Sequence, residues 1–299
     1  MVIKKIIRYI RNPYRLFDKL HMYSDFKWMS DEDFLKLTWR SQYNKKLDLN
    51  NPKSFNEKIQ WLKLNDKNPE YVKMVDKYEV KEYLQDRIGI EYVTKCYGVW
   101  NSFDDIDIES LPNQFVLKCT HDSVSIVICR NKSDFDWKAA KEIINTAMKK
   151  NHYYLSREWI YKEIVPRIIA EEYLDDGIND VPLDYKFFCF NGDIKYFKID
   201  YGRFLDHKAN YFDLDGNLLP FQMKGELNDI TKELVLPEGF STMVEIAQKL
   251  SENIKFVRID FYQIKDRVIV GEITFYPGSG LSPILPEEWD FKLGDWLDL

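Results

Sequence analysis

The spacing of apolar residues along the chain predicts helices in some segments and strands in others. Apolar positions recur with helical spacing from residue 1 to about 90, and again over 134–150, 156–169 and 239–253. Alternating or continuous apolar runs predict strands at 115–119, 126–130, 168–174, 182–202 and 256–275. The predicted helices come first in the chain, and the predicted strands follow in groups. This order predicts an α+β fold with a helical N-terminal region.

Local signals mark where several of these elements begin and turn. Asn191-Gly192 is a favoured type I′ turn between two aromatic strands, and the polar segment "THDSVS" at 120–125 separates two apolar strands. Ser30 and Ser54 are predicted helix caps, and Glu57 follows Ser54 at the spacing of a capping box. We therefore predict three parts. They are a helical region at 1–90, a small α+β lobe at 91–170 and a larger lobe at 171–299.

Charge and cysteine usage narrow the class of protein. The net charge of −6 argues against a general nucleic-acid-binding surface, so no nucleic-acid partner is expected. The four cysteines lie in apolar runs and no two have CxxC spacing, which predicts reduced core thiols in a cytoplasmic protein. No apolar run reaches the about 18 residues of a membrane-spanning helix, and no signal peptide is recognisable.

Residues 1–20 differ from the rest of the chain. They form a predicted amphipathic helix with six basic residues and one acidic residue, interrupted at Pro13. Such a helix can lie on the anionic inner face of a membrane, which would place the protein there. The alternative is that it packs on the protein body with a solvated outer face.

The last predicted hairpin places two acidic residues opposite each other. If Lys265-Asp266-Arg267 is the turn, Ile264 faces Val268 and Tyr262 faces Val270. The same count places Asp260 opposite Glu272, and Arg258 opposite Thr274. Opposed carboxylates repel each other unless a cation lies between them. Mg²⁺ is one candidate, because it binds a few carboxylate oxygens together with nucleotide phosphates. The alternative to a metal site is a solvated sheet face, on which the adjacent Arg258 makes the carboxylate pair tolerable.

Two lysines interrupt apolar strands. Lys118 is followed by the polar loop that contains His121, Asp122 and Ser123, and Lys186 repeats the pattern in "DYKFFCF". A lysine beside loop amides suits a phosphate group. A lysine that protects an edge strand from aggregation has the same pattern.

Further polar residues extend this candidate site. Glu171 and Glu172 end an apolar run, where they could bind an adenine amine and ribose hydroxyls or simply be solvated. His121 and His207 are candidate phosphate or substrate contacts, although histidines of this kind are more often ordinary hydrogen-bonded residues.

The order of these features along the chain resembles that of the ATP-grasp superfamily, in which two α+β lobes clamp ATP. The features are a strand with a lysine, a polar loop, a second strand with a lysine and a final hairpin with an Asp/Glu pair. The chain looks most like the TupA-like branch, named for teichuronopeptide synthesis and found in surface-polysaccharide gene clusters. The similarity runs from about residue 45 to the C-terminus. It is carried by "FNEKIQWLKL", "FVLKCTHDS", "EEYL", "DYKFFCFNG", "VRIDFY" and "GEITFYPGSG".

The resemblance implies a role for each matching residue. Asp260 and Glu272 would hold Mg²⁺, with Thr274 where many relatives have an asparagine ligand. Lys118 and Lys186 would bind ATP phosphates, and Arg258 would lie near the transferred phosphate. Adenine and ribose would contact Glu172 and the backbone near Tyr173 and Leu174. The loop departs from the pattern, because it has Val124-Ser125-Ile126 where relatives are glycine-rich.

The implied activity is an ATP- and Mg²⁺-dependent carboxylate–amine ligase that works through an acyl phosphate. Its substrate would be a capsule, O-antigen or cell-wall polysaccharide precursor, or an amino acid joined to one. Three alternatives stay open, namely a glycosyltransferase, an ATP-dependent sugar kinase and an inactive nucleotide-binding scaffold. The first is disfavoured because neither a DxD motif after a strand nor a Rossmann-like start is evident.

Overall fold

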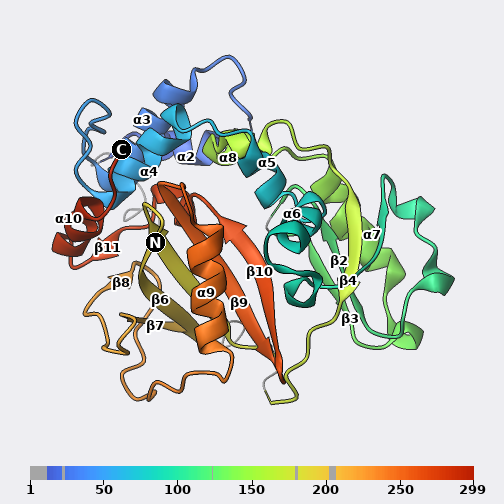
Figure 1. Cartoon of the computed structure of the whole chain (residues 1–299). Helices are drawn as coiled ribbons and strands as arrows, with labels where there is room; N and C mark the ends of the chain where they lie inside the picture. Colours follow the sequence, from blue (N-terminus) through green and yellow to red (C-terminus); the bar gives the residue numbers. More distant parts are fainter. Residues whose placement is uncertain (1–11, 22–23, 123, 179–180, 202–206) are drawn as a thin grey trace.

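The structure, a computed structural model, describes residues 12–21, 24–122, 124–178, 181–201 and 207–299. Two antiparallel sheets lie side by side, and most of the N-terminal helices lie along one side of the pair (Figure 1). Among the described residues, no helix is both long enough and apolar enough to cross a membrane. The predicted amphipathic segment falls largely on residues 1–11, outside the described ranges.

The helical region begins as the capping signals predict. Its helices are α2 (Arg15–His21), α3 (Asp31–Tyr43), α4 (Phe55–Asn65), α5 (Glu70–Val75) and α6 (Glu79–Ile88). The side chain of Ser30 accepts a hydrogen bond from the backbone of Asp33, and Ser54 and Glu57 form the complete capping box. Both predicted helix starts are confirmed.

The smaller sheet has the strand order β1-β4-β2-β3, in which every pair is antiparallel. Its strands are β1 (Cys96–Trp100), β2 (Phe115–Cys119), β3 (Ile126–Cys129) and β4 (Ile168–Glu172). Helix α7 (Trp137–Met148) packs on this sheet, so Ile144 shares a core with Phe115 and Leu117. The predicted hairpin of 115–119 with 126–130 is confirmed. Strand β4 crosses the predicted lobe boundary at residue 170, and the division itself stays a prediction.

The larger sheet has the order β10-β9-β5-β6-β7 and is also antiparallel. Its strands are β5 (Asp184–Phe190), β6 (Asp193–Tyr201), β7 (Lys208–Phe212), β9 (Phe256–Ile264) and β10 (Arg267–Thr274). Asn191 and Gly192 both have positive φ, as the predicted type I′ turn requires. The two-stranded pair of β8 (Gln222–Met223) with β11 (Ile284–Leu285), and the helices α9 (Phe240–Leu250) and α10 (Glu288–Asp295), complete this part of the chain.

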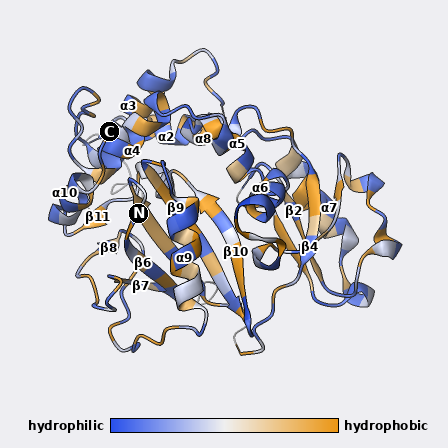
Figure 2. Cartoon of the chain, in the orientation of Figure 1, coloured by the Kyte–Doolittle hydropathy of each residue, from blue (hydrophilic) through white to orange (hydrophobic). Residues whose placement is uncertain are grey.

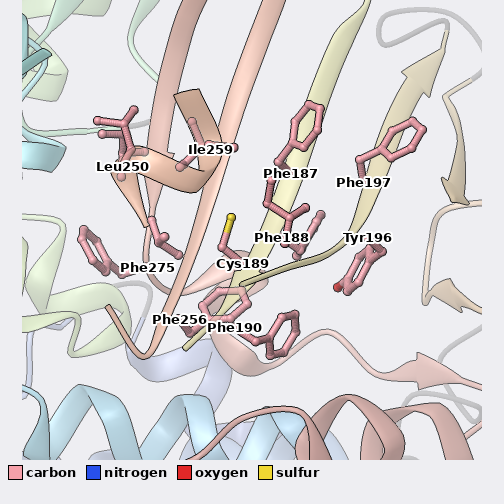
Figure 3. Close-up of a cluster of buried hydrophobic side chains, with 14 of the residues drawn as sticks. Phe187, Phe188, Cys189, Phe190, Tyr196, Phe197, Leu250, Phe256, Ile259 and Phe275 are labelled. Atoms are coloured by element: carbon pink, nitrogen blue, oxygen red, sulfur yellow. The ribbon is translucent and has the colours of Figure 1, made fainter. Parts of the chain in front are cut away.

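Aromatic side chains fill both sides of the larger sheet (Figure 3). Successive residues of β5 point to opposite faces. Phe187 therefore packs against Phe240 of α9, at 5.6 Å between ring centroids, and Phe190 packs against Phe55 of α4 at the same distance. Figure 2 shows the contrast between apolar strands such as β4 and the largely hydrophilic helix α6. The polar residues described below occupy the remaining part of one sheet face.

The predicted helix at 156–169 is wrong. Helix α8 (Tyr153–Ser156) ends there, a single 3₁₀ turn follows at Trp159–Tyr161, and β4 begins at Ile168. Arg157 stops the helix because its φ of 53° is left-handed, and its buried guanidinium lies 4.4 Å from the ring centroid of Phe34. Pro166 disfavours a new helix because it lacks a backbone N–H and restricts the residue before it.

Candidate active site

The hairpin of β9 and β10 brings together the two acidic residues that the sequence predicts. Asp260 pairs with Glu272, and Arg258 pairs with Thr274. The turn is shorter than predicted, so Ile264 pairs with Arg267 and not with Val268. Likewise, Tyr262 pairs with Ile269 and not with Val270. These two predicted pairs are wrong, and a bulge at Gly271 restores the register before Glu272.

Gly271 is suited to the bulge by its lack of a side chain. A Cβ atom at this position would lie 2.5 Å from Cε2 of Tyr262, closer than atoms approach without displacement. The extra residue in β10 makes up for the shortened turn. A side chain at position 271 would therefore have to displace the Tyr262 ring.

Strand β5 adds a lysine to the two carboxylates. Lys186 pairs with Asp260 in the register of β5 and β9, so Glu272, Asp260 and Lys186 cross three neighbouring strands. The Nζ atom of Lys186 lies 2.6 Å from Oδ2 of Asp260 and 2.5 Å from Oδ2 of Asp184. Burial opposes the charged lysine, but the carboxylates of Asp260 and Asp184 outweigh it and raise the pKa of Lys186.

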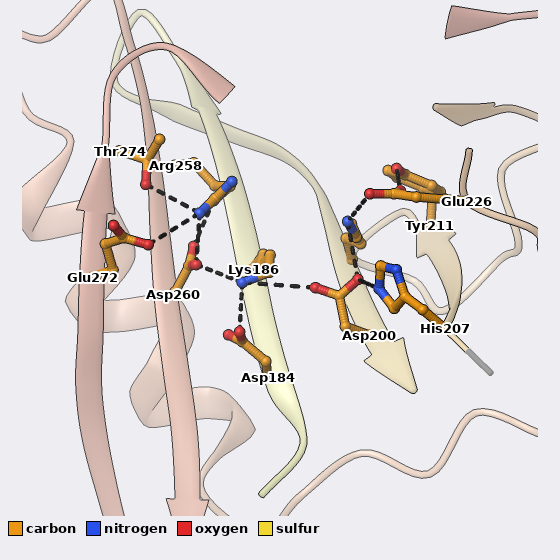
Figure 4. Close-up of polar contacts among 11 residues, drawn as sticks. Asp184, Lys186, Asp200, His207, Tyr211, Glu226, Arg258, Asp260, Glu272 and Thr274 are labelled. Carbon is orange, nitrogen blue, oxygen red and sulfur yellow. Dashed lines mark hydrogen bonds and ion pairs between the residues drawn. The ribbon is translucent and has the colours of Figure 1, made fainter. Parts of the chain in front are cut away.

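Arg258 is the cation that lies between the opposed carboxylates in this structure (Figure 4). Its Nε and one terminal nitrogen lie 2.6 and 2.7 Å from the two oxygens of Asp260. The same terminal nitrogen lies 3.0 Å from Oγ1 of Thr274 and 3.5 Å from Oε2 of Glu272. Although burial disfavours a charged carboxylate, Arg258 and then Lys186 lower the pKa of Asp260.

The acidic pair fits a metal ion that binds together with a phosphate group. Asp260 is buried, whereas the side chain of Glu272 is 41% exposed. Among the described residues, no group of three or more His, Cys, Asp or Glu side chains could hold a metal ion. Two carboxylates do not form a complete protein cage, but Mg²⁺ usually takes one or two carboxylates and fills its other positions with phosphates and water.

The smaller sheet contributes a second charged cluster. Glu171 on β4 lies between two lysines, with Nζ of Lys118 on β2 at 2.7 Å and Nζ of Lys81 on α6 at 2.5 Å. Burial favours the neutral acid, but the charges of Lys118 and Lys81 outweigh it and lower the pKa of Glu171 to about 2. Glu171 is therefore ionised at neutral pH, and it holds both lysines in place.

A cavity between the two sheets joins these clusters. Its polar lining includes Lys77, Lys81, Lys118, Glu171, Asp184, Asp260 and Glu272. A neighbouring, more apolar cavity shares Lys118, Glu171 and Gly271 with it. That second cavity is also lined by Val116, Ile128, Glu172, Tyr173, Leu174 and Pro182. Of the predicted nucleotide-binding residues, Lys118 and Glu171 line both cavities, Glu172, Tyr173 and Leu174 line the mainly apolar one, and Lys186 lines neither of the two.

The loop that follows β2 holds the remaining candidates differently. His121 is buried, and its Nε2 lies 3.0 Å from the backbone oxygen of Lys150, at the end of α7. Oδ1 of Asp122 accepts a hydrogen bond of 2.6 Å from Oγ of Ser125, which closes the loop on itself. Ser123 lies outside the described residues. In this structure the side chains of His121 and Asp122 thus stabilise the loop.

Glu172 and His207 lie at opposite ends of the site. Glu172 accepts two hydrogen bonds from the guanidinium of Arg267, at 2.9 and 3.3 Å, which links the smaller sheet to β10. Nε2 of His207 lies 2.9 Å from Oδ1 of Asp200, on the side of the polar row away from β10 (Figure 4). Oδ2 of Asp200 is 3.7 Å from Nζ of Lys186, so the histidine borders the same charged row.

Sequence reasoning missed several residues of the site. Asp184 could have been found, because strand alternation places it on the same face as Lys186 two positions later. Lys77 and Lys81 belong to the helical region, where no local pattern distinguishes them from solvated lysines. Only the tertiary structure brings them to a cavity lined by residues about 40 to 190 positions away.

Comparison with protein families gives one match, in which residues 57–298 fit the model described as TupA-like ATPgrasp. This match covers most of the chain. No curated protein matches significantly.

Solved structures with a similar chain path include D-alanine–D-alanine ligases. The enzyme from Helicobacter pylori has 16% identity and a TM-score of 0.40 over 75% of this chain and 61% of its own. The enzyme from Bacillus anthracis has 15% identity and a TM-score of 0.42 over 74% and 62%. An ADP complex of N5-carboxyaminoimidazole ribonucleotide synthetase has 11% identity and a TM-score of 0.43 over 82% and 57%. The chain spans less than two thirds of each of these proteins, and at these low TM-scores the fold assignment depends on the family match.

Proposed function

Because the chain belongs to the TupA-like ATP-grasp family, with its α+β ATP-grasp fold, we propose that it uses ATP and Mg²⁺ to join a carboxylate to an amine. The observation that carries this proposal is the cavity between the sheets. Lys118 of the smaller sheet lines it on one side, and Asp260 and Glu272 of the larger sheet line it on the other. Such a site offers cations to phosphates and carboxylates to a metal ion within one enclosed space.

The two adjoining cavities divide the recognition of ATP. The apolar cavity takes adenine between Val116, Ile128 and Leu174, where the backbone of Tyr173 and Leu174 can hydrogen-bond the base. The charged cavity takes the phosphates, which Lys118 binds from the smaller sheet. Lys186 binds them from the larger sheet, within a row that its carboxylate partners hold in place.

Asp260 and Glu272 would hold Mg²⁺, with the hydroxyl of Thr274 nearby. A Mg²⁺ ion held there would supply positive charge to neutralise the phosphates. Arg258 stays beside this pair through its hydrogen bonds to Asp260 and Thr274, and its guanidinium stabilises negative charge that develops on the transferred group.

The reaction has two steps. A substrate carboxylate oxygen attacks the γ-phosphorus of ATP, and the bond to ADP breaks to leave an acyl phosphate. The amine nitrogen then attacks the acyl carbon, phosphate departs with the electrons of the C–O bond, and the nitrogen loses its extra proton to form an amide. The protein contributes mainly positioning and charge stabilisation to both steps.

The proposed substrate is a precursor of a capsule, O-antigen or cell-wall polysaccharide, with a uronic acid or an amino acid as the carboxylate. The resemblance to proteins of teichuronopeptide synthesis supports this substrate class. Such precursors are assembled at the inner face of the cell membrane, which would place the protein in the cytoplasm at that face.

ADP release tests the reaction type. The protein is incubated with MgATP and a uronic acid, with and without an amino acid, and also with hydroxylamine, which converts an acyl phosphate to a hydroxamate. Amine-dependent ADP release with hydroxamate formation supports a ligase. A phosphorylated sugar formed without an amine would instead identify a kinase. ATP binding without turnover on any precursor pool would identify a scaffold, and binding of a sugar nucleotide in place of ATP would identify a glycosyltransferase.

A further inference from the structure

We propose that Glu158 binds the ammonium group of the amine substrate. This inference rests on the proposed function, because it assigns the second substrate to a place beside the same site. Glu158 lies between α8 and the 3₁₀ turn of Trp159–Tyr161, outside the strands that carry the charged residues of the site. The segment that leads into β4 would therefore take part in recognising the amine.

The carboxylate of Glu158 is buried without a direct partner. The residue is 6% exposed, and among the described residues its side chain has neither a hydrogen bond nor an ion pair. A buried carboxylate in this state is unfavourable, because burial removes its water and no donor replaces it. Its oxygens are not completely covered, so a small ligand can reach them. A cation with N–H donors would supply what the carboxylate lacks.

The neighbouring Lys63 of α4 does not fill this role. Burial lowers the pKa of Lys63 to about 8, and the charge of Glu158 opposes this effect, so the two groups lie near each other. However, Nζ of Lys63 donates to the backbone oxygens of Ser156 and Ser279, at 3.0 and 2.8 Å, and to Oγ of Ser279 at 2.7 Å. These contacts use all three N–H donors of the ammonium. Lys63 thus supplies charge near Glu158 but no hydrogen bond to it.

The same contacts of Lys63 place Glu158 near the end of β10. Ser156 is the last residue of α8, and Ser279 lies in the turn that follows β10, so the lysine joins these two segments. Figure 1 shows the end of β10 pointing towards α8. Glu158 follows α8 closely in the chain and therefore lies at the end of the strand that carries Glu272.

Tyr161 lies near both Glu158 and the acidic pair. Its backbone N–H donates to the backbone oxygen of Glu158 at 3.1 Å, so the two residues share one turn. Burial, and then the charges of Glu158 and Glu272, raise the pKa of Tyr161. The charge of Arg258 acts in the opposite direction. Because Arg258 is proposed to stabilise the transferred group, an ammonium held by Glu158 would lie near the acyl phosphate that it attacks.

The competing explanation is that Glu158 only balances the buried charge of Lys63. A structural role of that kind would affect every nucleophile equally. A carboxylate that binds the amine instead matters for a nucleophile that arrives as an ammonium ion, because the interaction depends on charge. Near neutral pH, ammonia is present mainly as ammonium, whereas hydroxylamine is largely uncharged. Comparing these two nucleophiles separates the two roles.

The experiment measures ADP release from MgATP and a uronic acid by the full chain, with ammonium chloride or hydroxylamine as the nucleophile and sodium chloride to hold the ionic strength constant. Glu158→Gln removes the charge and keeps the size. Glu163→Gln, at an exposed position of the same segment, is the matched control.

We expect Glu158→Gln to raise the half-saturating concentration of ammonium by about tenfold or more, as the loss of a charged hydrogen bond would, and that of hydroxylamine by less than about twofold. Glu163→Gln should change both concentrations by less than about twofold, because an exposed charge is screened. Titration calorimetry should give the same MgATP affinity for the wild type and both variants.

The outcomes distinguish this inference from the proposed function. Wild-type protein that forms a hydroxamate but does not respond to ammonium, or equal changes for the two nucleophiles in Glu158→Gln, would overturn the inference and leave the proposed function standing. Folded wild-type protein that forms no hydroxamate from any uronic acid or amino acid would overturn both. If Glu158→Gln does not fold, the pair Lys63→Met/Glu158→Gln removes both buried charges, and the same comparison of ammonium with hydroxylamine applies.

Discussion

Asp260 and Glu272 face each other on neighbouring strands, and the guanidinium of Arg258 reaches both of them. The repulsion expected between opposed carboxylates is thus relieved within the protein before any ligand binds. Asp260 is fully engaged by Arg258 and Lys186, whereas Glu272 keeps only the longer contact of 3.5 Å and a partly exposed side chain. Glu272 is therefore the member of the pair most available to a metal ion.

The first prediction concerns the bulge that sets this pairing. Gly271→Ala places a methyl group against the ring of Tyr262 and should destabilise the protein by about 1–3 kcal/mol, as overpacking usually does. Urea denaturation of Gly271→Ala, Tyr262→Ala and the double variant measures the coupling. The alanine at 271 should cost less when the ring is absent. An equal cost in both backgrounds would show that the ring does not set the bulge.

The second prediction concerns Lys186. Lys186→Met leaves the buried carboxylates of Asp184 and Asp260 without their shared cation and should cost about 3–5 kcal/mol at pH 7. Lys186 is, after Arg258, one of the two cations that lower the folded-state pKa of Asp260, so its removal raises that pKa. The folded state then binds protons more readily, so the cost should grow as the pH rises above about 4.

Urea denaturation at pH 4.5 and pH 7 tests this pH dependence. Lys195→Met is the control, because Lys195 forms an exposed pair with Asp193 on the neighbouring strand β6, where a loss of at most about 1 kcal/mol is expected. A cost for Lys186→Met that does not change with pH would contradict the proposed burial of the carboxylates.

The third prediction concerns acid stability. The lysines beside Glu171 lower its folded pKa to about 2 from an ordinary value of 4.5, and lysines also lower the pKa of Asp200 to about 2. A depressed folded pKa gives stability that is present above the unfolded pKa and lost as the pH falls towards the folded one. For Glu171 this amounts to about 3 kcal/mol lost between pH 4.5 and 2.

Denaturation curves at several pH values in this range provide the measurement. Glu171→Gln should be less stable than the wild type at pH 7 and should lose less stability on acidification. If the variant and the wild type lose stability in parallel between pH 4.5 and 2, Glu171 does not have the depressed pKa.

The fourth prediction concerns the thiols. All four cysteines are free, and burial raises the pKa of Cys119 to about 11 and that of Cys189 to about 12. Cys129 is also buried, and Cys96 is partly exposed. A thiol reagent at pH 8 should therefore modify at most one cysteine of the native protein and all four after unfolding. Rapid modification of two or more native thiols would contradict the predicted core positions.

Much of the site could be predicted from the sequence because strand alternation fixes which residues share a face. The predicted pairs of Asp260 with Glu272 and of Arg258 with Thr274 are confirmed, because two errors in the predicted hairpin compensate for each other. The turn is shorter than expected, and the bulge at Gly271 adds the residue back. The alternation of apolar residues in β10 does not reveal where the extra residue is inserted, although Gly271, which leaves room for the Tyr262 ring, marks the place in the structure.

The failures have a common physical cause. Ile160, Ile164 and Ile168 have helical spacing, but Arg157 and Pro166 prevent a helix. Ile160 and Ile164 are buried in the core of the larger sheet, whereas Ile168 is buried in that of the smaller sheet. Lys81 was missed because its partner Glu171 is 90 residues away in the chain. Periodicity reports local geometry, and contacts of this range are decided by how the elements pack.

Titration calorimetry of ATP with and without Mg²⁺ tests the central claim most directly. The proteins compared are the wild type, Glu272→Gln and the control Glu245→Gln, whose glutamate is exposed on α9. The proposed site predicts Mg²⁺-dependent ATP binding that weakens by about tenfold or more in Glu272→Gln and is unchanged in Glu245→Gln. ATP binding that is independent of both Mg²⁺ and Glu272, or no binding by the folded wild type, would contradict it.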